Sequence, residues 1–431
     1  MDIRMLNTGV FFRLLLVAMF LSISCTCSSD DEKVKNPVSQ VESLSFYDAS
    51  QGLPRTGLWR RAVAFFDLNG DGFPDILAPP PRKASVVERH PFVWHGAKNS
   101  LWKQGELEVP GDISYGYGSI AVADFNQDKI PDLALAMHML PSRVLIGTKD
   151  GKYRDFSKGI PSAKELTSRG LTTSDLNNDG KPDLIIVSEA DFSRNGYDVK
   201  GVMVCFHDGK KWNCREAQKD RKEPGLFADQ VVTGDINGDG YKDIAVALLA
   251  TEKNQVAWIN DGKGGFDPFN NGLLKDTIYN SVALGDINKD GRDDLVAAIS
   301  GFGRDALYGP RVFMSGPEGF TQYSKGLPEK ESVHAVTLGD LNGDGVVEII
   351  CGTGKGGVKV FEQDGKKWKE MAVSGLPVEG LERIYGIYCL DINHDGKNDI
   401  GFNYAPGEGK NDGGIRVFLN GKRPAAKPSE E

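Results

Sequence analysis

A nine-residue acidic phrase recurs seven times along the 431-residue chain, and this repetition constrains the fold more than any other feature. The first copy reads DLNGDGFPD, from residue 67 to residue 75, and the later copies keep its order of polar and apolar residues. The first aspartates of successive copies lie 51 to 60 residues apart, with a mean of 54. Self-similarity at this period indicates a solenoid, a propeller or an array of repeats.

Each repeat has the pattern of four short strands and almost no helical periodicity. An apolar stretch such as VHAVTLG precedes the phrase, and a β-rich stretch such as DLIIV follows it. A third stretch, such as VAWINDG, leads through turn residues into a fourth. β-branched runs bounded by Asp-Gly and Asn-Gly turns are typical of antiparallel strands. Seven such units predict an all-β fold, a seven-bladed β-propeller of four-stranded blades.

The two ends of the repeat region predict how the ring closes. The tag that ends other blades, as in FSKGIP, also occurs as FYDASQGLP at residues 46–54, before the first phrase, while the seventh copy stops after RVFLNG. We therefore expect residues 43–50 to form the outer strand of blade 7 beside Val417 to Asn420, in a propeller spanning residues 44–420. A linear stack of repeats is the alternative, but it would not explain why one strand is displaced to the start of the chain. Closure of the ring explains it, because the displaced strand pairs with blade 7 and covers its exposed edge.

Every copy of the phrase places oxygen-bearing side chains at positions 1, 3, 5 and 9. Position 6 is glycine in six copies, where a sharp turn needs a positive φ, and Lys129 in the second. Four side-chain oxygens and the position-7 carbonyl form a hard donor set that suits Ca²⁺ better than Mg²⁺. An EF-hand is excluded, because no copy has an acidic residue at position 12 and strands follow instead of helices.

The repeats therefore predict up to seven structural calcium ions, with the Asp124 copy the weakest because of its lysine. Acidic turns that hold no metal and merely cap strands are the alternative. The predicted ligands, copy by copy, are Asp67, Asn69, Asp71 and Asp75; Asp124, Asn126, Asp128 and Asp132; Asp175, Asn177, Asp179 and Asp183; Asp235, Asn237, Asp239 and Asp243; Asp286, Asn288, Asp290 and Asp294; Asp340, Asn342, Asp344 and Glu348; Asp391, Asn393, Asp395 and Asp399.

The segments GDINGDGYKDIAVA and GDLNGDGVVEII resemble the FG-GAP/VCBS-type repeats of bacterial secreted proteins, which are related to the propeller of integrin α subunits. The resemblance covers roughly residues 45–420. It implies that each calcium loop joins the first and second strands of a blade on the lower face of the ring. It does not by itself imply integrin-like adhesion.

A second set of residues lies six positions before the first aspartate of each phrase, where the first strand enters from the opposite face. Seven-fold geometry would place these residues around the upper mouth of the central channel, as a ligand site or as a solvated rim. Arginines there would suit a carboxylate or a sulfate group. The six members able to bind a ligand are Arg61, Arg169, Asp229, Asn280, His334 and Tyr385.

Residues 1–24 have the pattern of an export signal, with an apolar stretch too short to span a bilayer. The segment LSISC resembles a lipoprotein signal that would leave Cys25 lipidated; ordinary secretion is the alternative. Residues 25–43 then form a flexible tether, and residues 421–431 a disordered tail. We expect an outer-membrane or cell-surface lipoprotein, or else a periplasmic or secreted one, with the lipid as its only membrane contact.

Cys205 and Cys214 flank a turn and could form a disulfide across a hairpin in an oxidising compartment. A net charge of −9 argues against a nucleic-acid partner. No motif of a catalytic site occurs, so no catalytic residue is assigned. The leading hypothesis is a monomeric, non-catalytic module that recognises a polysaccharide or protein. A polysaccharide lyase with its site at the channel mouth is the alternative, since one fold hosts many functions.

Overall fold

The computed structural model describes residues 44–423, apart from residues 61, 85–88, 99–100, 189–200, 219–227, 249–254, 302–306 and 407–411. The expected export signal, Cys25, the tether, Arg61 and most of the tail lie outside the described residues. Throughout the described part of the chain every helix or strand assigned is a β-strand, as expected for an all-β fold. The same residues contain no helix that could span a membrane.

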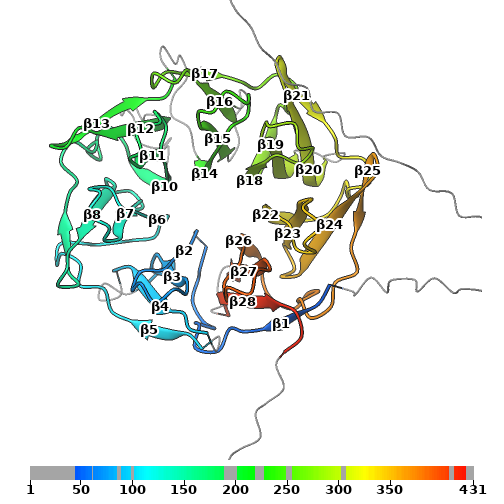
Figure 1. The fold of residues 1–431 in the computed structure, drawn as a ribbon, viewed down its shortest axis with the longest axis horizontal. Coiled ribbons are helices and arrows are strands. Elements are labelled where there is room, and N and C mark those ends of the chain that lie inside the picture. The colour runs from blue at the N-terminus through cyan, green and yellow to red at the C-terminus, as the bar shows by residue number, and fades with distance from the viewer. Residues whose placement is uncertain are drawn as a thin grey trace, which may run out of the picture. The chain divides into compact units, whose positions relative to one another are not determined.

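The strands form seven four-stranded antiparallel sheets in sequence order, and Figure 1 shows them as blades around a common centre. Blades 1 to 3 consist of β2 (Ala64–Phe66), β3 (Asp75–Ala78), β4 (Phe92–His95) and β5 (Lys103–Gly105); β6 (Ile120–Ala123), β7 (Asp132–Leu135), β8 (Arg143–Gly147) and β9 (Tyr153–Asp155); β10 (Ser168–Ser174), β11 (Asp183–Ser188), β12 (Val202–His207) and β13 (Trp212–Glu216). Blades 4 and 5 consist of β14 (Ala228–Gly234), β15 (Asp243–Leu248), β16 (Ala257–Asn260) and β17 (Phe266–Pro268); β18 (Thr277–Gly285), β19 (Asp294–Gly301), β20 (Tyr308–Gly316) and β21 (Gly319–Gln322).

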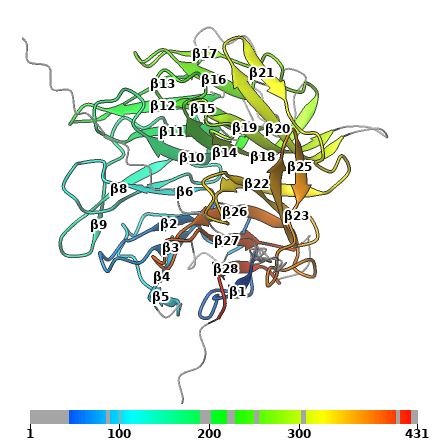
Figure 2. The same ribbon diagram turned by 45° about the vertical axis from the view of Figure 1, so that its right-hand side comes forward.

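Blade 6 consists of β22 (Val333–Gly339), β23 (Glu348–Thr353), β24 (Val358–Asp364) and β25 (Lys367–Glu370). Blade 7 combines β26 (Ile384–Leu390), β27 (Asp399–Tyr404) and β28 (Gly414–Asn420) with β1 (Phe46–Asp48) from the start of the described chain. β1 pairs antiparallel with β28, with Phe46 opposite Asn420, and Figure 2 shows the two side by side.

The hydrophobic core lies between neighbouring blades. The second strand of each blade is buried along most or all of its length, as in β15, where all six residues are buried. One apolar cluster joins Ile185 and Val204 of blade 3 to Val231 and Ile244 of blade 4. Because both faces of a blade pack against neighbours, these strands read as continuous apolar runs instead of alternating ones.

Candidate functional site

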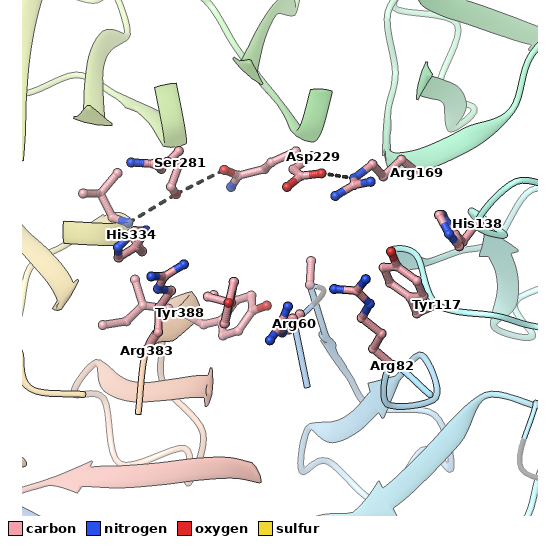
Figure 3. A pocket seen from close by; sticks show the side chains of 17 residues that line it. Arg60, Arg82, Tyr117, His138, Arg169, Asp229, Ser281, His334, Arg383 and Tyr388 are labelled. Carbon is pink, nitrogen blue, oxygen red and sulfur yellow. Dashed lines mark hydrogen bonds and ion pairs between the residues drawn. The ribbon is translucent and has the colours of Figure 1, made fainter. Parts of the chain in front are cut away.

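A polar cavity of about 530 Å³ lies where the first strands of the blades begin, at their ends opposite the acidic loops. All seven blades contribute to its lining, as Figure 3 shows from close by. One lining residue from each blade, in chain order, is Arg60, Tyr117, Arg169, Asp229, Asn280, His334 and Tyr385.

β-Bulges position five of these side chains. In the first strands of blades 3 to 7, one residue is skipped in the pairing with the second strand. The skipped residues are Arg169, Asp229, Asn280, His334 and Tyr385. Successive residues of a regular strand point to opposite faces, but a bulge redirects them. Two consecutive residues can thus line the cavity, as Asp229 does with Gln230.

Four arginines give the cavity a positive charge. Arg169 is only 9% exposed and forms an ion pair with Asp229, the one acidic residue of the lining. Arg60 lies 5.4 Å and Arg383 lies 5.8 Å from the centre of the Tyr385 ring, so both make cation–π contacts with it. Arg82 lies 5.7 Å from the centre of the Tyr117 ring. Four guanidiniums against one carboxylate leave a formal charge of +3.

A line of hydrogen bonds joins three neighbouring blades in the wall of the cavity. The Val336 amide donates to Ser281 Oγ at 3.2 Å, and that hydroxyl donates to Gln230 Oε1 at 3.1 Å, which links blades 6, 5 and 4. His334 is neutral at pH 7, because burial and the nearby Arg383 lower its pKa to about 4.

Five of the six predicted ligand residues meet in this one cavity: Arg169, Asp229, Asn280, His334 and Tyr385. Arg61 lies outside the described residues, and its neighbour Arg60 lines the cavity. Sequence reasoning missed the other contributors from blades 1, 2 and 7, namely Arg60, Arg82, Tyr117, His138 and Arg383. Arg60 and Arg383 stand seven and eight positions before the first aspartate of an acidic phrase, so a search one or two residues further upstream would have found them.

The acidic loops share one backbone conformation at the other end of the strands. Positions 4 and 6 are left-handed in all seven loops, with φ between 56° and 88°. The position-1 carboxylate accepts hydrogen bonds from the loop backbone, as in Asp235, whose oxygens accept from the amides of Gly238, Asp239 and Gly240. Lys129 adopts this conformation too, with φ of 68°, and its amide donates to Asp124 Oδ2 at 2.7 Å.

The carboxylate at position 9 is buried in every loop and holds the loop to the sheet. In five blades one oxygen accepts from the position-2 amide and the other from an amide in or directly after the third strand; Asp243, for example, accepts from Ile236 at 2.7 Å and Asn260 at 2.8 Å. Burial raises the pKa of Asp243 and of Glu348 to about 7, although the backbone donors oppose the shift.

The donor chemistry of the loops fits Ca²⁺, because every predicted ligand is a hard oxygen and a carboxylate that accepts two amide bonds keeps further lone pairs. Among the described residues, however, no three His, Cys, Asp or Glu side chains converge as a metal site.

The cysteines of blade 3 form a disulfide. Cys205 of β12 and Cys214 of β13 are directly opposite in the strand register and are bonded. Of the remaining described cysteines, Cys351 is a buried free thiol and Cys389 is a partly buried one.

Comparisons with known proteins place these features in a family context. The FG-GAP-like repeat family matches residues 230–297 and 340–402. Integrin alpha-PS2 of Drosophila melanogaster is 29% identical over 161 residues, which are 35% of this chain and 12% of that protein. Phosphatidylinositol-glycan-specific phospholipase D of Bos taurus is 28% identical over 42% of this chain and 24% of its own length. A T-cell immunomodulatory protein homolog of Plasmodium falciparum is 26% identical over 53% and 36%.

The chain thus spans about a third or less of the length of these relatives. The crystal structure of BBS1N in complex with ARL6DN shares the fold, with a TM-score of 0.52 and 11% identity over 87% of this chain and 96% of that one. With seven four-stranded blades and an integrin α chain among its relatives, the chain is an integrin-like β-propeller that contains FG-GAP-like repeats at residues 230–297 and 340–402.

Proposed function

We propose that this chain is a non-catalytic recognition module that binds a polysaccharide or protein in the cavity at the centre of the propeller. The observation that carries the proposal is the convergence of side chains from all seven blades on one polar cavity. Long polar side chains lose conformational entropy when they are held in place, so their collection at one point is costly unless a ligand uses them.

The proposal includes export and calcium. Up to seven Ca²⁺ ions would occupy the acidic loops and hold the ring together, because each cation would offset two of the three carboxylate charges in its loop. The Cys205–Cys214 disulfide supports an oxidising compartment outside the cytoplasm. There the protein would be a monomer, attached to the outer membrane or cell surface through a lipid on Cys25.

A binding screen tests this function. The full chain, produced with its export signal, is screened against polysaccharides and surface proteins with Ca²⁺ or with EDTA. We expect saturable binding in Ca²⁺ and weaker binding, together with a lower melting temperature, in EDTA. A protein that binds no member of either class would contradict the recognition role, and an unchanged melting temperature would contradict the calcium role.

A lyase is the second candidate, and the neutral His334 is the observation that favours it. A neutral imidazole can accept a proton, and the arginines beside it could neutralise the carboxylate of an acidic sugar. A pKa of about 4 makes His334 a weak base at neutral pH, however, which ranks this candidate second. Unsaturated products that accumulate with wild type but not with His334→Asn would establish the lyase.

A further inference from the structure

We propose that the cavity binds a polyanionic glycan, whose sulfate or carboxylate groups contact Arg60, Arg82 and Arg383 while its hydroxyl groups contact the opposite wall. This inference rests on the proposed recognition function and names the ligand class. It starts from the contrast between a chain of net charge −9 and a cavity of formal charge +3.

The three arginines have no carboxylate partner in the described part of the chain. The ion pairs found there include Arg169 with Asp229 but none formed by Arg60, Arg82 or Arg383. Like charges gathered without counter-charges repel one another, and this arrangement is relieved when an anion binds. The charge of Arg169, by contrast, is already neutralised by Asp229, and this ion pair connects blades 3 and 4 in the cavity wall.

Aromatic rings and one backbone bond fix the guanidiniums in advance of binding. The Tyr385 ring is shared by Arg60 and Arg383, and the Tyr117 ring supports Arg82. Arg60 Nη2 donates to the Pro406 carbonyl at 2.9 Å, while the buried Arg60 Nε has no hydrogen-bond partner. Because that Nε is buried, an anion in the cavity would reach the guanidinium through its terminal nitrogens. Pre-ordered forks of this kind bind oxygen pairs at low entropic cost.

The positions of the arginines suit repeated charges along a chain. Figure 3 shows Arg383, Arg60 and Arg82 along one side of the cavity and the Arg169–Asp229 pair on the opposite side. One isolated carboxylate can engage one guanidinium fork fully, so three forks in succession match several anionic groups.

The opposite wall favours a hydroxyl-rich ligand over a peptide. Asn280, Ser281 and Gln230 line it, and the bulges bring Asn280 and Ser281 to the same cavity. Gln230 Oε1 already accepts bonds from Ser281 Oγ and the Val282 amide, so its NH₂ group is the part left to donate. Ala62, Val336 and Ile387 are the aliphatic side chains of the lining, and Tyr117, Tyr385 and Tyr388 add aromatic rings. Sugar rings can stack on such aromatic faces.

Binding of defined polymers to the full chain tests the inference. Dextran sulfate supplies sulfate groups, polygalacturonate supplies carboxylates, uncharged dextran is the neutral glycan, and poly-glutamate is the acidic peptide. Affinities are measured by calorimetry in Ca²⁺ for wild type, Arg82→Gln, Arg383→Gln and the matched control Arg154→Gln, whose side chain is exposed on β9. Thermal melts verify that each variant is folded, and Arg82→Lys retains the charge without the fork.

We expect dextran sulfate, polygalacturonate or both to bind at least tenfold more tightly than dextran and poly-glutamate. The stronger of the two identifies the anionic group. Arg82→Gln and Arg383→Gln should each weaken that binding about tenfold, Arg82→Lys should weaken it less, and Arg154→Gln should leave it unchanged. Equal binding of dextran, equal binding of poly-glutamate, or equal losses in Arg154→Gln would overturn the inference. If wild type binds a neutral glycan or a protein regardless of these arginines, the recognition function stands and the polyanion inference fails.

Discussion

Replacing Asp243 with alanine should destabilise the propeller strongly, because this carboxylate is a structural joint as well as a predicted calcium ligand. The side chain is fully buried and accepts hydrogen bonds from the amides of Ile236 at 2.7 Å and Asn260 at 2.8 Å. Its removal leaves two buried amides without a partner, at about 1–3 kcal/mol each. Burial of the carboxyl itself, which raises its pKa to about 7, offsets part of that sum. We therefore expect a loss of about 3 kcal/mol in the free energy of unfolding.

Urea unfolding followed by tryptophan fluorescence measures this loss. The experiment is run in EDTA, so that a change in calcium affinity does not enter, and then repeated in Ca²⁺, where the loss should grow. Asp267→Ala is the matched control, since Asp267 is exposed on β17 of the same blade and its loss should cost less than about 0.5 kcal/mol. Asp243→Asn keeps one acceptor and should fall between the two. The reasoning is refuted if Asp243→Ala unfolds within about 1 kcal/mol of the control.

Three further changes test other parts of the structure. Lys129→Gly removes a positive charge that would repel a cation, together with a left-handed backbone that costs a non-glycine residue about 1 kcal/mol, so calcium titration should show tighter binding at the Asp124 loop; an unchanged isotherm would argue against this. His334 has a pKa lowered from 6.5 to about 4, so the folded chain binds fewer protons than the unfolded chain between these values, and stability falls as the pH drops. From about pH 7 to pH 5, wild type should lose about 1 kcal/mol more than His334→Asn in denaturant titrations, after allowance for partial exposure; parallel curves would contradict the shift. Replacing Cys205 and Cys214 with serine opens a loop with a sequence separation of 9 and should cost about 2–3 kcal/mol, measured as a lower melting temperature that reducing agent no longer changes.

The fold could be predicted because its signals are local. Asp-Gly turns and β-branched runs recur within each repeat, so strand number and blade number follow from the sequence alone. Glycine at position 6 in six of the seven acidic phrases likewise predicted a left-handed backbone there. The phrases gave no clear sign that position 4 is also left-handed, since Gln127, Lys289 and His394 occupy it with φ near 60°.

The cavity could be predicted only in part. Counting six positions back from the first aspartate of each phrase located Arg169 and His334. This count works because the first strands of their blades begin at a similar distance in sequence before the phrase. The bulges that turn these side chains inward depend on pairing with the second strand, which no single strand encodes. Arg82 comes from a connection between second and third strands, and only the assembled ring brings it to Tyr117. The sequence also did not show that Asp243 holds the loop to the sheet. Its hydrogen-bond partner Asn260 is 17 residues further along the chain, and only the paired strands bring the two together.

The pairing of β1 with β28 has a consequence for biosynthesis. Phe46 emerges from the ribosome among the earliest residues of the propeller, yet its partner Asn420 is among the last. Blade 7 therefore cannot be completed until nearly the whole polypeptide has been made, and β1 must wait unpaired while six other sheets assemble. The pairing of β1 with β28 is expected to be slow, because the two strands are far apart in the sequence. The entropy of closing so long a loop must be overcome before the contact forms. The ring can therefore close only when translation of the propeller is almost complete.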